Sequence, residues 1–82
     1  MISCSDYDYI EIACMHHYLL RVSMRNGQTL EGTALDTARN EMKVECIKLK
    51  QAQQEVLIVL DDIVLIEVLT ANPHFQSKTF CG

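Results

Sequence analysis

The chain has 82 residues, which is enough for one small domain and too few for two. Hydrophobic residues make up 49% and charged residues 22%, a balance that excludes an intrinsically disordered chain. Eleven acidic and seven basic residues give a net charge of −4, so the surface repels phosphate groups and a primary nucleic-acid-binding protein is disfavoured.

The N-terminus has neither the basic region nor the long apolar run of a secretory signal. The longest apolar stretch, Val56–Leu69, is interrupted by three acids and is too short for a membrane helix. We therefore expect a cytoplasmic protein with no membrane association. In that reducing compartment cysteines are expected to be free thiols.

The chain has four cysteines, at Cys4, Cys14, Cys46 and Cys81. They lack the short paired spacing that is typical of a zinc site. The best metal candidate is the run Cys14-Met15-His16-His17, but adjacent histidines on a strand point to opposite faces. We expect no bound metal and no cofactor, with a small metalloprotein built on this run as the weaker alternative.

The first predicted element is a short helix that begins near Ser5, a plausible N-cap, with Asp8 in the first turn. Apolar residues recur on one helix face: Tyr7, Ile10 and Cys14. Asp8 and Glu11 form a neighbouring stripe that can face outward. A helix of two to three turns is not stable alone, so it must dock on the rest of the domain.

Alternating apolar residues predict three strands next, at Tyr18–Arg25, Gln28–Asp36 and Glu41–Leu49. Asn26-Gly27 predicts a type I′ hairpin turn, and residues 37–40 are expected to form a second turn. Gly32 inside a strand suggests a sharp bend, as in small closed barrels. Met42, Val44 and Cys46 are expected on one face of the third strand.

Two almost continuously apolar strands follow at Val56–Leu60 and Ile63–Ile66, so both of their faces are expected to be covered. Asp61-Asp62 leaves room only for a tight connection between them. After Thr70 the chain loses its pattern, and we expect residues 1–70 to form the domain and residues 71–82 a flexible tail.

A leading helix followed by five short-looped antiparallel strands predicts a mainly β fold, an Sm-like (SH3-like) small barrel. An OB-fold normally carries a helix between its third and fourth strands, and the connection here is too short for one. No catalytic motif is present, so we do not expect an enzyme.

The N-terminal segment is the unusual part of the sequence, because residues 1–17 contain acids and no Lys or Arg. Its acidic and aromatic residues suit a basic protein partner: Tyr7, Asp8, Tyr9 and Glu11. The alternative is a solvated helix face with ordinary capping acids. The run CSDYDYIEIACMHH, Cys4 to His17, closely resembles the N-terminal signature of the Rof family of bacterial Rho-binding antiterminators. The resemblance continues through Asn26-Gly27, Val44-Glu45 and Leu60-Asp61, covering roughly residues 4–70.

The resemblance implies an Sm-like barrel with an N-terminal helix that binds the transcription termination factor Rho. It implies that binding blocks the primary RNA-binding site of Rho, which lies in an OB-fold domain, and so inhibits termination. The partner-binding residues it implies are Asp6, Tyr7, Asp8 and Glu11 on the helix, with Lys43 on the loop between the second and third strands. We expect a monomer when free, and the alternative is an Sm-like RNA-binding or ring-forming module.

Overall fold

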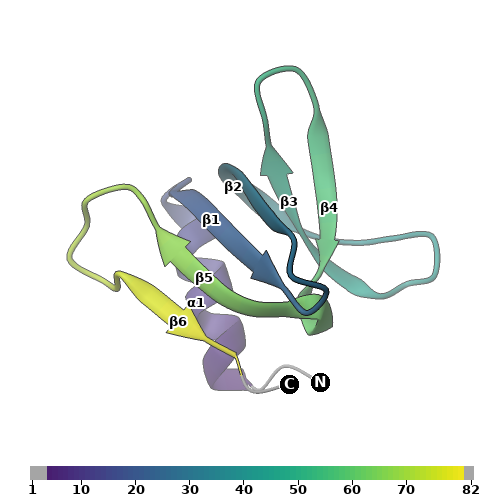
Figure 1. The fold of residues 1–82 in the computed structure, drawn as a ribbon, viewed down its shortest axis with the longest axis horizontal. Coiled ribbons are helices and arrows are strands. Elements are labelled where there is room, and N and C mark those ends of the chain that lie inside the picture. Colours follow the sequence, from purple (N-terminus) through teal and green to yellow (C-terminus); the bar gives the residue numbers. More distant parts are fainter. Residues whose placement is uncertain (1–3, 81–82) are drawn as a thin grey trace.

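One bent antiparallel sheet and one helix make up the protein in a computed structural model that describes residues 4–80 (Figure 1). The elements follow in the order α1 (Cys4–Met15), β1 (Leu19–Met24), β2 (Thr29–Arg39), β3 (Glu45–Lys50), β4 (Glu55–Val59), the 3-10 turn η1 (Leu60–Asp62), β5 (Ile63–Val68) and β6 (Ser77–Thr79). The strands are ordered β4-β3-β2-β1-β5-β6, every neighbour antiparallel. The predicted mainly β fold with a leading helix is confirmed, with six strands in place of five.

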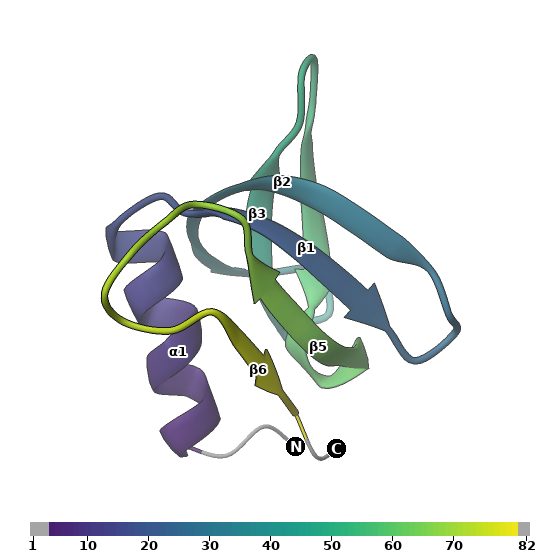
Figure 2. The same cartoon turned by 60° about the vertical axis from the view of Figure 1, so that its left-hand side comes forward.

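Helix α1 lies across one side of the sheet and buries Ile10, Ala13 and Cys14 (Figure 2). It begins at Cys4, so Ser5 lies inside the helix and is not the N-cap that the sequence had predicted. The helix ends where His17 takes a left-handed φ of 52°. The amide of His17 then donates to the Cys14 carbonyl (3.2 Å) and that of Tyr18 to the Ala13 carbonyl (3.0 Å). This is a Schellman motif, with histidine where glycine is usual.

The β1–β2 hairpin turns at Asn26-Gly27 as predicted, but its turn type was predicted wrongly. Gly27 has a φ of 88°, whereas Asn26 is not among the described residues with a positive φ. The Gly27 amide donates to the Met24 carbonyl, and the Met24 amide donates to the Gln28 carbonyl, each at 2.9 Å. The connection is therefore a three-residue loop with one left-handed glycine at its end, rather than a type I′ turn.

Strand β2 lies unusually close to β3 at Gly32. A Cβ atom on Gly32 would lie 3.0 Å from both the Leu49 Cβ and the Lys50 carbonyl oxygen, so any other residue would push β3 away by a few tenths of an ångström. The pairing of β2 with β3 is irregular further along, between Ala34 and Asp36. Such a bulge bends the strand, so the curvature expected at Gly32 is shared with the bulge two residues later.

The predicted boundary between the second and third strands was wrong. Residues 37–39 continue β2 and pair with β3, and the turn lies at residues 40–44. The Asn40 side-chain oxygen accepts from the amides of Met42 (2.9 Å) and Val44 (3.1 Å), and Lys43 has a φ of 62°. These contacts close a loop and leave Met42 and Val44 exposed instead of on a strand face.

Strands β4 and β5 are joined by a single 3-10 turn, η1, which confirms the tight connection predicted at Asp61-Asp62. Buried residues on these elements include Ile58, Leu60, Ile63 and Ile66. The expectation that both faces of β4 are covered was wrong, because Leu57 is 46% exposed. Helix α1 covers the sheet near β2 and leaves the outer side of β4 open.

The expected flexible tail is wrong for residues 71–80, because they return to the sheet and form β6 against β5. The Phe80 amide donates to the Val64 carbonyl (2.9 Å), and its ring is 6% exposed. Figure 2 shows this C-terminal segment beside α1, where the rings of Tyr9 and Phe75 meet edge to face at 5.0 Å. The proposed domain boundary at residue 70 therefore cuts through the fold.

Gly32→Ala should destabilise the protein, because the added methyl has no room between β2 and β3. We expect the free energy of unfolding to fall by about 1–3 kcal/mol in urea titration followed by circular dichroism. Thr29→Ala, at an exposed position of the same strand, is the control and should leave stability nearly unchanged. An equal loss in both variants would contradict the close-approach argument.

Phe80→Ala should lower the free energy of unfolding by about 3 kcal/mol, because it removes a buried aromatic ring. The exposed residue Thr79 provides the control, and Thr79→Ala should leave stability nearly unchanged. Urea titration of both variants measures the difference. Equal stability of Phe80→Ala and the wild type would mean that the C-terminal segment contributes nothing to the core.

Candidate partner-binding site

The outer helix face consists of Asp8, Glu11 and Met15, which follow one another at helical spacing and are all exposed. Met15 is 72% exposed, although methionine is a residue that usually finds a buried place. The opposite side of α1 carries the buried residues, so docking of the helix on the sheet fixes the direction of this face. Two carboxylates and an apolar side chain are thus presented together, with no basic residue anywhere on α1.

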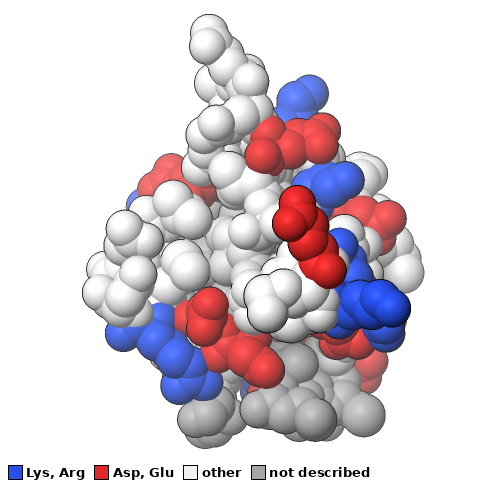
Figure 3. All heavy atoms as spheres, turned by 90° about the vertical axis from the view of Figure 1, so that its right-hand side faces the viewer, with Lys and Arg blue, Asp and Glu red and all other residues white. Residues whose placement is uncertain are grey.

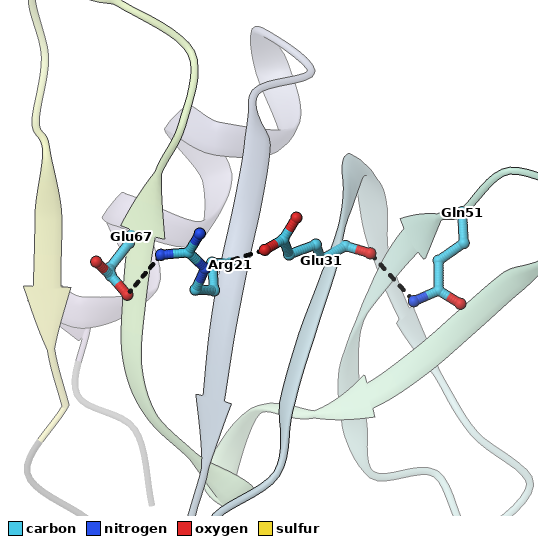
Figure 4. Close-up of polar contacts among 4 residues, drawn as sticks. All are labelled: Arg21, Glu31, Gln51 and Glu67. Atoms are coloured by element: carbon cyan, nitrogen blue, oxygen red, sulfur yellow. Dashed lines mark hydrogen bonds and ion pairs between the residues drawn. The ribbon is translucent and has the colours of Figure 1, made fainter.

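The acids of the outer helix face differ from most others in having no ion-pair partner within residues 4–80. On the sheet, Arg21 lies between Glu31 (3.0 Å) and Glu67 (3.8 Å), as Figure 4 shows. The hydrogen bond that Arg21 donates to Glu31, followed by the charges of Glu31 and Glu67, raises the pKa of Arg21. Those two carboxylates are already matched by a cation, whereas Asp8 and Glu11 are not.

Figure 4 also places Gln51 next to Glu31, because its side-chain amide donates to the Glu31 carbonyl at 3.1 Å. The loop between β3 and β4 is thereby tied to β2. This part of the sheet is occupied by contacts within the protein.

Asp6 and Tyr7, predicted to bind a partner, lie on different sides of α1 from Asp8. The Asp6 carboxylate is only 14% exposed and pairs with the Lys78 amine at 3.3 Å. That amine also lies 4.9 Å above the ring of Tyr9. Tyr7 is half-buried and packs against the core. Asp6 therefore ties the helix to β6, and Tyr7 borders the exposed face.

Asp36 on β2 was missed as a site residue by the sequence prediction, which treated it only as the end of a strand. It lines a hollow between α1 and β2 together with Glu11, Cys14, Met15, His17, Leu35 and Thr37. The bulge after Ala34 changes the side-chain alternation at this point. The only signal in the sequence was that Asp36, at the end of a predicted strand, lies close to the bend expected at Gly32.

The pKa of the buried Cys14 thiol is affected by the charge around this hollow. Its pKa is raised to about 11, first by burial and then by the negative charges of Asp36 and Glu11. Both carboxylates are therefore close enough to the Cys14 thiol to raise its pKa. The thiol is protonated at neutral pH, which excludes it as an activated nucleophile.

Lys43, the remaining predicted site residue, is not brought together with the helix. It lies on the loop between β2 and β3, which extends at the right-hand edge of Figure 1, whereas α1 lies left of centre. Figure 3 faces this edge and shows acidic and basic side chains interleaved on it. Ion pairs on this side include Arg39 with Glu45 (3.9 Å) and Lys48 with Glu55 (4.0 Å).

The side chains of the run from Cys14 to His17 do not come together at one site. The His16 ring stacks on His74 (4.7 Å) and Tyr18 (5.3 Å), and the Tyr18 hydroxyl and His74 Nδ1 are hydrogen-bonded at 2.6 Å. His17 Nδ1 donates to the Ala34 carbonyl at 2.9 Å. Within residues 4–80, no group of three or more His, Cys, Asp or Glu side chains is arranged to hold a metal ion. None of the described helices is long and apolar enough to cross a membrane.

Known proteins resemble this chain in both sequence and fold. Protein rof of Escherichia coli (strain K12) is 34% identical over 62 residues, which cover 76% of this chain and 73% of that protein. Protein rof of Shigella flexneri matches to the same extent. The solved structure of YaeO bound to magnesium, from Vibrio cholerae O395, is 39% identical with a TM-score of 0.88, covering 92% of this chain and 97% of that one.

The family model for the modulator of Rho-dependent transcription termination (ROF) matches residues 1–80, almost the whole chain. The resemblance seen in the N-terminal run is thus confirmed by the full sequence and by the fold. This chain belongs to the Rof family of modulators of Rho-dependent transcription termination.

Proposed function

We propose that this protein binds Rho at its primary RNA-binding site, blocks RNA loading and so inhibits Rho-dependent termination. The single observation that carries the proposal is the outer helix face, where Asp8 and Glu11 are exposed with no ion pair in the described part of the chain. A site that holds RNA presents basic side chains and stacking surfaces. An acidic helix with an apolar residue beside it can occupy such a site in place of RNA.

The energetics favour a contact centred on the helix. Exposed ion pairs contribute only about 0–1 kcal/mol each, so affinity depends on charges that become desolvated and on apolar contact. Met15 supplies exposed apolar surface directly beside Glu11, and half-buried Tyr7 adds a rigid ring at the border. Asp6 supports this arrangement by holding α1 against β6 through Lys78.

Lys43 belongs to the proposal only as a second contact, because its loop lies across the molecule from α1. It would meet a different surface of Rho from the one that receives the helix. We propose a cytoplasmic protein that is a monomer when free, with no catalytic activity of its own.

Charge reversal on the outer helix face should abolish Rho binding without unfolding the protein. Asp8→Lys and Glu11→Lys are each expected to weaken affinity at least about 100-fold, since a cation then faces the basic RNA site. Glu55→Lys is the matched control, because it makes the same charge change on β4 and breaks only a 4.0 Å ion pair. Fluorescence anisotropy with labelled protein measures affinity, and circular dichroism checks the fold.

The same titration should be repeated as competition against a cytidine-rich RNA bound to Rho. The wild type should displace the RNA, and the Asp8 and Glu11 variants should not. A gel shift of the same RNA with this protein alone should show no complex. Binding of Rho without displacement of RNA would contradict the proposed site, and a shifted RNA would favour the Sm-like RNA-binding alternative.

Affinity for Rho should fall as salt is raised from about 50 to about 500 mM, because long-range attraction between the acidic face and the basic site is screened. The fall should be steeper for the wild type than for Asp8→Asn, which removes one charge from the contact. Identical slopes, or an affinity that does not change with salt, would contradict an electrostatic contact.

A further inference from the structure

We propose that the hollow between α1 and β2 is a socket for one arginine side chain of Rho, held between Glu11 and Asp36. This makes Asp36 a partner-binding residue contributed by the sheet, beyond the helix residues. The inference rests on the proposed function and names the chemistry that the outer helix face recognises.

The two carboxylates come from different elements and line the same hollow, together with the exposed side chain of Met15. Within residues 4–80 neither carboxylate has an ion pair. Asp36 Oδ1 accepts from the Thr37 amide at 2.8 Å, which fixes the carboxylate and leaves its second oxygen available. Cys14 forms the buried side of the hollow, with its thiol in the field of both acids.

The polar groups around the hollow are mainly acceptors. The Ala34 carbonyl can only accept, so His17 Nδ1 carries a proton and donates it to this carbonyl. The lining includes no Lys or Arg. A guanidinium group matches this set better than an ammonium, because its five donors can bond to two carboxylates at once. The arginine stem would lie along Met15.

The backbone adds a further attraction for a cation at this place. The hollow lies beside the C-terminal end of α1, which carries partial negative charge from the aligned peptide dipoles. The last turn of α1 contains no basic residue to balance it. A cation from outside the protein would therefore meet two carboxylates and a helix C-terminus together.

The test is a double-mutant cycle with Rho, using Glu11→Gln, Asp36→Asn and the double variant. Asn keeps the oxygen that accepts from the Thr37 amide, so the bulge should be retained. We expect each single variant to weaken affinity about 10-fold, and the double variant only about 10–30-fold, because both acids hold the same group. Asp62→Asn, an exposed acid on η1, is the control and should bind like the wild type.

The outcomes separate this inference from the proposed function. Unchanged affinity in Asp36→Asn, with binding lost in Asp8→Lys, would overturn the socket and leave the proposed function standing. A double variant weakened about 100-fold would show that the two acids contact different groups, and would also overturn it. Failure of the wild type to bind Rho or displace RNA would overturn both.

A second measurement addresses arginine directly and does not need Rho. Nα-acetyl-arginine amide and Nα-acetyl-lysine amide are titrated separately while amide NMR signals are followed. The arginine probe should shift signals of residues 11–17 and 35–37 at lower concentration than the lysine probe, and Asp36→Asn should remove the difference. Equal shifts by both probes, or no shift in these residues, would overturn the assignment of arginine.

Discussion

The packing of α1 on the sheet is the constraint on which the rest of the molecule depends. A helix of 12 residues is marginal in water, so it exists here because Ile10 and Ala13 are fully buried against the sheet. The C-terminal segment holds the helix from another side through Lys78, which reaches both Asp6 and the ring of Tyr9. With both contacts in place, the direction of the outer helix face is set by the core.

The elements with a strong periodic signal were predictable from the sequence. The leading helix, the first hairpin and the tight link at Asp61-Asp62 follow from local patterns, and the structure has all three. The β2–β3 boundary did not follow, because Asn40 closes a loop with its side chain where apolar alternation favoured a strand. Strand β6 has only three residues, and its pairing with β5 joins segments distant in the chain, so no local pattern indicates it.

The candidate site was also predictable only where it depends on a local sequence pattern. Asp8 and Glu11 share a face because of helical spacing alone, and that relation needs no tertiary information. Asp6 lies only two residues from Asp8, yet a rotation of about 200° around the helix turns it toward Lys78. Asp36 joins Glu11 across two elements through the β2 bulge, and such a juxtaposition cannot be read from a linear pattern.

The effect of the net charge of −4 depends on where the acidic residues lie on the surface. On the sheet and around β3 and β4, acids are interleaved with cations, so these surfaces are close to neutral at short range. Asp8, Glu11 and Asp36 are not matched in this way within the described chain: Asp8 and Glu11 lie on α1, and Asp36 lies beside its C-terminal end. Because these carboxylates stay hydrated in the free protein, leaving them unpaired costs little stability. The same charges become favourable once a basic surface displaces that water, so the feature with little effect on folding has the largest consequence for binding.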